Sequence, residues 1–243
     1  MSPNGPYLWL TRRPAQPTRL RRLAAERGYP AGVGVLIAVE GLDGAGKHTL
    51  VTGLANRWAT HGYRVRTLTF PRYSESVTAD IAAEALHGEH GDLRSSVHAM
   101  AILFALDRRD AAEYLRKLLA ANDAVILDRY VASNAAYSAA RLGQDADCEV
   151  VQWVTTLEFS RFGLPVPDHH LLLDVPTDVA IGRAKSRAEL NSSRLRDHYE
   201  RDHELQERTG LVYRSLAEMG WMSPWSRLGT EADAELADRL IAI

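Results

Sequence analysis

The sequence has very little cysteine and no long apolar run. Cys148 is the only cysteine among 243 residues, so an intrachain disulfide is excluded and a cysteine-based zinc site is not expected. No segment approaches the roughly 18 consecutive apolar residues of a transmembrane helix. The apolar stretch at residues 7–10 is too short for the core of a secretory signal. We therefore expect a cytoplasmic protein without a membrane partner.

A strong net charge is also missing. The formal net charge is −2, which gives no general reason to expect nucleic acid as a partner. Hydrophobic residues make up 46% of the chain and charged residues 25%, close to the average of globular domains. The length indicates one domain or at most two.

The first 32 residues differ from the remainder. They hold five prolines, six arginines and a single acidic residue, Glu26, with no pattern that predicts a buried face. We expect residues 1–32 to be a disordered or non-native arm. A basic arm that touches nucleic acid and a transit peptide remain alternatives. The compact domain is then expected to span residues 33–243.

Within that domain, short apolar runs alternate with segments of helical periodicity. Strands are predicted at 35–40, 64–70, 124–128, 170–175 and 225–229, and helices at 47–59, 95–120, 150–159, 178–190, 198–219 and 232–241. Such alternation is typical of a parallel sheet. The prediction is an α/β fold of the P-loop NTPase class, with a central five-stranded parallel sheet flanked by helices on both faces.

The clearest motif is EGLDGAGKHTL, from Glu40 to Leu50, which contains Gly-x-x-x-x-Gly-Lys. It follows a buried strand and opens a helix, as a phosphate-binding P-loop requires. The helix start presents unpaired N–H groups and a positive dipole end to an anion. The residues expected to contact the nucleotide phosphates are Gly41, Asp43, Gly44, Ala45, Gly46, Lys47, His48 and Thr49.

The loop departs from the usual pattern directly after Lys47. His48 stands where a Ser or Thr hydroxyl ordinarily ligates magnesium, and Thr49 points about 100° away around the helix. Magnesium prefers oxygen ligands to imidazole. We therefore expect Mg²⁺ to be held by the carboxylates of Asp43 and Asp128, with Glu200 as a further candidate through water.

Three further motifs follow the P-loop along the chain. They are Phe70-Pro71-Arg72-Tyr73, then Asp107-Arg108, then Asp128-Arg129-Tyr130 with Ser133, Asn134 and Tyr137 behind it. Together with the P-loop, this order resembles the thymidylate kinase family, and its actinobacterial members most. The resemblance covers about residues 35–230. It implies ATP-dependent phosphorylation of dTMP to dTDP with Mg²⁺.

The resemblance also implies a role for each matching residue. Arg129 would hold the dTMP phosphate, a ligand that suits its planar fork. Phe70 would stack on the thymine ring, while Arg108 and Asn134 would bind the base edge. Tyr137 would lie under the deoxyribose, and Tyr73 would contact the sugar or phosphate region.

Residues 183–201 are rich in arginine and lysine, and we expect them to form a lid over ATP. Phosphoryl transfer needs cations around the transferring group. Some family members carry an arginine inside the P-loop, but this chain has Gly44 and Ala45 there. The catalytic set expected from the sequence is Lys47, Asp43, Arg129, Arg187 and Arg194.

The long helix at 95–120 has a broad apolar surface, and the family resemblance suggests that it forms a homodimer interface. Simple core packing is the alternative. Two other functions stay open at this point. The chain could phosphorylate another nucleoside monophosphate or a deoxynucleoside, or it could be a catalytically silent module that binds nucleotide or DNA.

Overall fold

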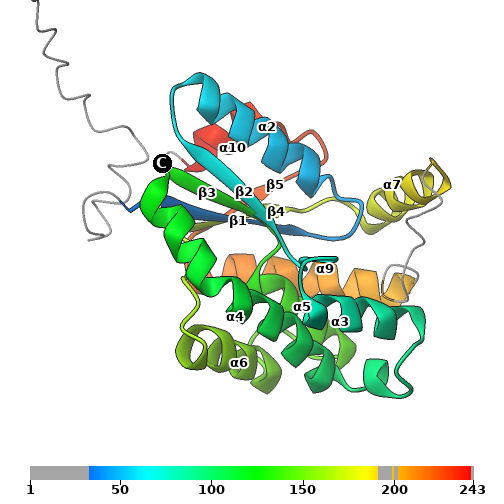
Figure 1. Cartoon of the computed structure of the whole chain (residues 1–243). Coiled ribbons are helices and arrows are strands. Elements are labelled where there is room, and N and C mark those ends of the chain that lie inside the picture. The colour runs from blue at the N-terminus through cyan, green and yellow to red at the C-terminus, as the bar shows by residue number, and fades with distance from the viewer. Residues whose placement is uncertain (1–32, 191–198, 200–201, 242–243) are drawn as a thin grey trace, which may run out of the picture.

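The computed structural model describes residues 33–190, 199 and 202–241 (Figure 1), so the arm expected at 1–32 lies outside it. A five-stranded sheet runs through the centre in the order β2-β3-β1-β4-β5, and every pairing is parallel. The strands are β1 (Val35–Gly41), β2 (Val65–Thr69), β3 (Ala124–Asp128), β4 (His169–Leu173) and β5 (Trp225–Leu228). The predicted sheet is thereby confirmed.

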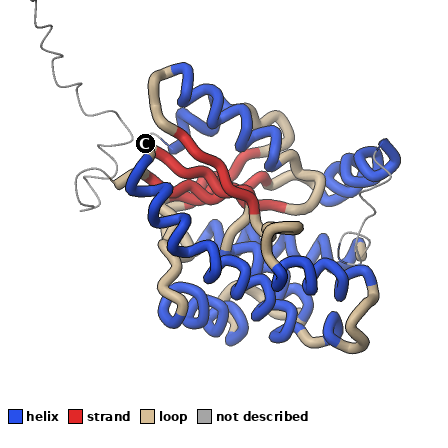
Figure 2. Tube along the Cα trace, viewed as in Figure 1, coloured by secondary structure: helices blue, strands red, loops and turns tan. Residues whose placement is uncertain are grey.

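Helices cover both faces of the sheet, as expected (Figures 1 and 2). On one face lie α2 (Lys47–Thr60) and α10 (Ala234–Ile241), which contact each other. The other face is covered by α4 (Val97–Ala121), α5 (Val131–Arg141) and α9 (His203–Glu218). Behind them pack α3 (Val77–His87) and α6 (Glu149–Thr155), and α7 (Thr177–Leu190) projects from the end of β4.

The core forms where the sequence is continuously apolar. Every residue of β1 and β3 is buried, which is what a strand covered on both faces requires. Helix ends follow local signals: Ser76 caps α3, Ser96 caps α4, and Asp202 caps α9 by accepting a hydrogen bond from the N–H of Leu205.

Two element boundaries differ from the sequence prediction by more than two residues, and two α-helices, α3 and α5, were not among the predicted ranges. Of the helix expected at 198–219, the structure has α9 from His203, where Asp202 supplies the cap, while residues 198, 200 and 201 lie outside the described part. The helix expected at 150–159 ends at Thr155 and continues as a π-helical segment, Thr156–Arg161. Helix α3 was missed because its buried face consists mainly of alanines, which give a weak apolar pattern.

The carboxyl ends of β1 and β3 bring the P-loop and the segment after Asp128 to the same edge of the sheet. That edge is where open parallel sheets bind ligands. Within the described residues, no helix has the length and apolar character needed to cross a membrane.

Candidate active site

The P-loop joins β1 to α2 with three glycines at positive φ, Gly41, Gly44 and Gly46. Gly44 is required by space as well as by conformation. A Cβ atom built there would lie 2.0 Å from the backbone oxygen of Ala180 in α7. The loop is therefore in close backbone contact with the start of the helix that leads into the expected lid.

Lys47 is buried, and its Nζ donates to the carbonyl of Leu42 across the loop (2.9 Å). Burial, followed by the charge of Arg129, lowers the pKa of Lys47 to about 8, although Asp43, Asp128 and Glu40 oppose the shift. The side chains of His48 and Thr49 are exposed at the start of α2. Lys47 thus supplies the cation inside the loop, while His48 lies at its rim.

Asp43 and Arg129 are 86 positions apart in sequence and in direct contact. Nη2 of Arg129 donates to Oδ1 of Asp43 (2.5 Å), and the hydroxyl of Tyr137 donates to Oδ2 (2.9 Å). Burial opposes ionisation of Asp43, but Arg129 and Lys47 hold the pKa of its carboxyl well below the ordinary value. Asp43 is therefore an anion between two cations. Asp43, Arg129 and Tyr137, all expected in the site, are therefore in direct contact.

Arg129 is also held by a network in which Tyr130 and Ser133 belong to the motif after Asp128, while Glu40 is not among the expected site residues. Nη1 of Arg129 donates to the hydroxyl of Ser133 (3.0 Å), and the Ser133 hydroxyl donates to Glu40 (2.7 Å). Glu40 also accepts from the N–H of Tyr130 (2.9 Å) and from the hydroxyl of Tyr213 (3.2 Å). The one available signal was a carboxylate ending the apolar strand VLIAVE.

Arg108 and Asn134 also come together, through a third residue. Both donate to Glu158, a fully buried carboxylate in the π-helical segment. The neighbouring Asp107 binds Arg72, whose Nε donates to Oδ1 of Asp107 (2.8 Å). Sequence reasoning did not identify Glu158, because it stands alone between apolar neighbours in a helical pattern.

Phe70 and Tyr73 lie just past the end of β2. Phe70 is 1% exposed, and its ring centroid lies 5.8 Å from that of Tyr130. Tyr73 is 46% exposed at the surface. The expected contacts of Phe70 with the base and of Tyr73 with the sugar or phosphate therefore stay predictions.

Of the expected lid residues, Arg194 and Glu200 lie outside the described part of the chain, as does the side chain of Arg187. Arg183 on α7 does reach the P-loop, where its Nη1 donates to the carbonyl of Ala45 (3.4 Å). Arg183 is the first residue of the segment expected to form the lid, but it is not in the expected catalytic set.

The donor chemistry at the sheet edge fits a magnesium ion. Asp43 and Asp128 offer carboxylate oxygens, and both act on the charge of Lys47. Within the described residues, the Asp128 carboxylate makes no hydrogen bond that would occupy it. These carboxylates could hold the ion without an imidazole ligand, which agrees with the exposed position of His48.

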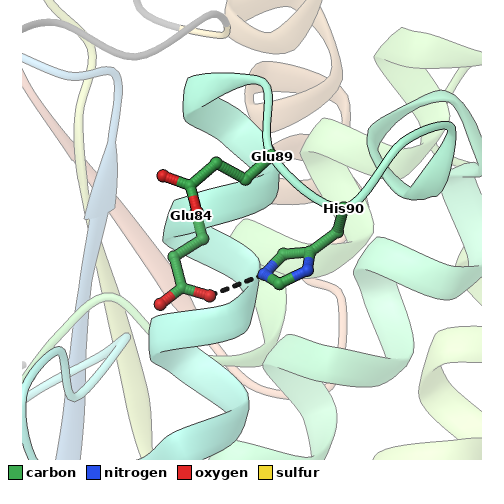
Figure 3. A group of neighbouring side chains, drawn as sticks. All are labelled: Glu84, Glu89 and His90. Atoms are coloured by element: carbon green, nitrogen blue, oxygen red, sulfur yellow. Dashed lines mark hydrogen bonds and ion pairs between the residues drawn. The ribbon is translucent and has the colours of Figure 1, made fainter.

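A different group of metal-ligand type lies at the C-terminal end of α3 and just beyond it (Figure 3), where Glu84, Glu89 and His90 place their ligand atoms within 4.8 Å of one another. Nε2 of His90 lies 2.6 Å from Oε2 of Glu84. The side chains of His90 and Glu84 are 40% and 46% exposed. An ion pair at the surface accounts for this geometry, which does not by itself define a metal site.

A P-loop at the edge of a parallel sheet, a buried lysine in it, and an arginine paired to a loop carboxylate define a P-loop nucleotide phosphotransferase. A family model described as "Thymidylate kinase" matches residues 39–223. A thymidylate kinase of Mycobacterium tuberculosis is 56% identical over 199 residues, which are 82% of this chain and 93% of that protein. The chain belongs to the thymidylate kinase family, and the expected likeness to actinobacterial members is confirmed.

More distant relatives agree with this placement. A probable thymidylate kinase of Archaeoglobus fulgidus is 34% identical over 158 residues, covering 65% of this chain and 72% of that protein. The solved thymidylate kinase of Candida albicans superposes with a TM-score of 0.61 at 22% identity, covering 86% of this chain and 89% of that one. At 22% identity, this structural similarity supports the fold alone.

Proposed function

We propose that this protein transfers the terminal phosphoryl group of ATP to dTMP, giving ADP and dTDP. The proposal rests on the observation that the residues matching the family's motifs lie close together. Lys47 and Asp43 of the P-loop and Arg129 of the segment after β3 assemble at one edge of the sheet. The 56% identity to a thymidylate kinase over most of both chains supports the choice of substrate.

The P-loop binds the ATP phosphates through its backbone N–H groups and the charge of Lys47. Arg129 binds the dTMP phosphate with its guanidinium fork. Its contact with Asp43 then places the acceptor phosphate beside the loop that holds the donor. Little covalent chemistry is required of the protein, because alignment and screening of the phosphates supply most of the catalysis.

Mg²⁺ would be held at Asp43 and Asp128, with Glu200 contributing through water. It supplies charge neutralisation between the phosphates. Asp43 is ionised and lies between Arg129 and Lys47, so it carries the negative charge that a metal requires. Arg129 and Tyr137 fix the orientation of this carboxylate by one hydrogen bond to each of its oxygens.

The base and sugar of dTMP are assigned to residues on α4, on α5 and just after β2. Arg108 and Asn134 bind the base edge, and Tyr137 lies under the deoxyribose, where it crowds a 2′-hydroxyl. Tyr73 contacts the sugar or phosphate region. Phe70 stacks on thymine, which requires neighbouring side chains to move on binding because the ring is 1% exposed.

The lid is assigned to residues 183–201, with Arg187 and Arg194 as the cations that stabilise the transferring group. The contact of Arg183 with the Ala45 carbonyl supports an approach of this segment toward the loop. We assign the kinase domain to residues 33–243 and treat residues 1–32 as an arm without a catalytic role.

We propose further that the protein is a cytoplasmic homodimer with no nucleic-acid partner. Helix α4 leaves Ile102 and Tyr114 exposed (39% and 54%), which supports an interface there. Light scattering coupled to gel filtration should give about twice the chain mass of 27.0 kDa. A mass equal to one chain at micromolar concentration would contradict the dimer.

A coupled assay of ADP release with different acceptors tests the catalytic proposal. dTMP should be preferred, dUMP accepted, and UMP and dCMP poor. Comparable catalytic efficiency with UMP or CMP would instead indicate a kinase for another nucleoside monophosphate. No ADP release with any acceptor, together with tight ATP binding, would indicate a silent nucleotide-binding module.

A further inference from the structure

Glu158 connects the two residues assigned to the base edge. Its carboxylate accepts two hydrogen bonds from Arg108, from Nε to Oε2 (2.5 Å) and from Nη2 to Oε1 (2.7 Å). Oε1 also accepts from Nδ2 of Asn134 (2.8 Å). Glu158 is fully buried, Arg108 is 3% exposed and Asn134 is 5% exposed. The three residues come from the π-helical segment, α4 and α5, so the contact fixes three elements at one point.

The Asn134 amide can adopt one orientation only. Its Nδ2 donates both to Glu158 and to the backbone carbonyl of Ala101 (3.0 Å). A carboxylate and a carbonyl are acceptors, so a flipped amide would place Oδ1 against two oxygens and lose both bonds. The two amide protons are used inside the protein, and the amide oxygen is the group left for a ligand.

Arg108 is constrained in the same way. Nε and one side of Nη2 are committed to Glu158, which leaves Nη1 as a donor. Burial opposes its charge, but the Glu158 carboxylate raises the pKa of Arg108 above its ordinary value. Arg108 therefore presents a permanently charged donor.

The two remaining atoms are open to a ligand. Within the described residues, neither Nη1 of Arg108 nor Oδ1 of Asn134 has a protein hydrogen-bond partner, and neither is among the enclosed polar atoms that lack one. Each therefore reaches solvent. The pair offers one donor and one acceptor.

We propose that Glu158 is a positioning residue that selects thymine and uracil over cytosine by fixing this donor–acceptor order. The inference rests on the proposed assignment of Arg108 and Asn134 to the base. Thymine and uracil present an N3–H donor beside an O4 acceptor, which match Oδ1 of Asn134 and Nη1 of Arg108. Cytosine presents an N3 acceptor beside an N4 amine. Its N3 would then face the acceptor Oδ1 of Asn134, and its amine would face the donor Nη1 of Arg108.

Glu158→Gln tests the proposal with little change in size. In either orientation the glutamine NH₂ faces a donor: Nε of Arg108 when the glutamine oxygen takes the place of Oε1, or Nη2 of Arg108 and Nδ2 of Asn134 when it takes the place of Oε2. The variant therefore no longer holds Arg108 and Asn134 together in one fixed arrangement. The efficiency kcat/KM for dTMP should fall at least about tenfold, while that for dCMP stays constant or rises. The dTMP/dCMP ratio should therefore fall at least about tenfold, with the KM for ATP unchanged.

Two matched variants separate positioning from general damage. Glu158→Asp keeps the carboxylate and should retain most of the dTMP/dCMP ratio. Glu113→Gln makes the same chemical change at an exposed position of α4, where the side chain is 71% exposed, and should leave every constant unaltered. A loss for dTMP and dCMP by the same factor in Glu158→Gln would overturn the proposal.

The amide orientation is also measurable without any variant. In ¹⁵N-labelled unaltered protein, the Nδ2 protons of Asn134 should exchange slowly with solvent, both before and after dTMP binds. Rapid exchange of both protons would overturn the proposal even where Glu158→Gln fails to fold. If the unaltered protein does not phosphorylate dTMP, the proposed function fails; if it does and the ratio is unchanged in Glu158→Gln, only the role of Glu158 fails.

Discussion

His170 should make the folded protein sensitive to mild acid. It lies on β4 with 0% exposure, stacked on Trp225 at a centroid distance of 4.3 Å, with Nδ1 2.8 Å from the Ser223 hydroxyl. Nε2 is enclosed and has no hydrogen-bond partner in the described part of the chain. Burial, followed by the charge of His169, lowers the pKa of His170 from 6.5 to about 3.

The sign of the effect follows from comparing folded and unfolded chains. Between pH 6.5 and about 3 the unfolded chain binds a proton at His170 and the folded chain does not. The free energy of unfolding is therefore fully retained above the unfolded pKa and declines as the pH falls below it. For an unfolded pKa of 6.5, the loss on going from pH 7.5 to 5.5 is about 1.4 kcal/mol.

Denaturant titration followed by tryptophan fluorescence measures this loss in the unaltered protein and in His170→Phe. Phenylalanine keeps a flat ring against Trp225 but cannot titrate. The variant should lose about 1.4 kcal/mol less than the unaltered protein over the same pH interval. The comparison is between two pH values for each protein, so the loss of the Ser223 contact cancels.

His87→Phe is the control, because His87 is exposed at the end of α3. It should follow the pH dependence of the unaltered protein. Equal pH dependence in His170→Phe and the unaltered protein would refute the reasoning, since His170 would then titrate alike in folded and unfolded chains.

Further predictions concern the loop and its arginine. Arg129→Ala should weaken dTMP binding by tenfold or more, because each charge-assisted hydrogen bond to a phosphate contributes about 1.5–3 kcal/mol; equal weakening of ATP and dTMP in titration calorimetry would contradict its assignment. His48→Ala should reduce turnover at most about tenfold, or about 1.4 kcal/mol of barrier, whereas Asp43→Asn should reduce it far more; a mild Asp43→Asn beside an inactive His48→Ala, measured against Mg²⁺ concentration, would place the metal elsewhere. Gly44→Ala should destabilise the fold by more than Gly88→Ala, because both have positive φ but only the first meets the backbone of α7; equal midpoints in thermal unfolding would argue against that contact.

The sequence predicted the sheet well because its strands are buried on both faces. The runs at 35–40 and 124–128 are continuously apolar, and the structure has β1 at Val35–Gly41 and β3 at Ala124–Asp128. A buried parallel strand leaves this pattern whatever its neighbours are. Strand order, by contrast, depends on pairings between distant segments that no local pattern records.

The site was predictable where residues belong to compact motifs. Lys47, Asp43 and Arg129 were each expected, but the contact between Asp43 and Arg129 spans 86 positions and came only from the structure. Glu158 was missed for a related reason. Its partners lie 50 and 24 positions away, so the local sequence shows a lone acid in a helix, which ordinarily faces solvent.

The close approach of Gly44 to α7 also limits how this enzyme could evolve. The backbone oxygen of Ala180 occupies the space that any side chain at position 44 would need. An arginine at position 44 would therefore require the start of α7 to move away first, so a change in the loop and a change in the helix depend on each other.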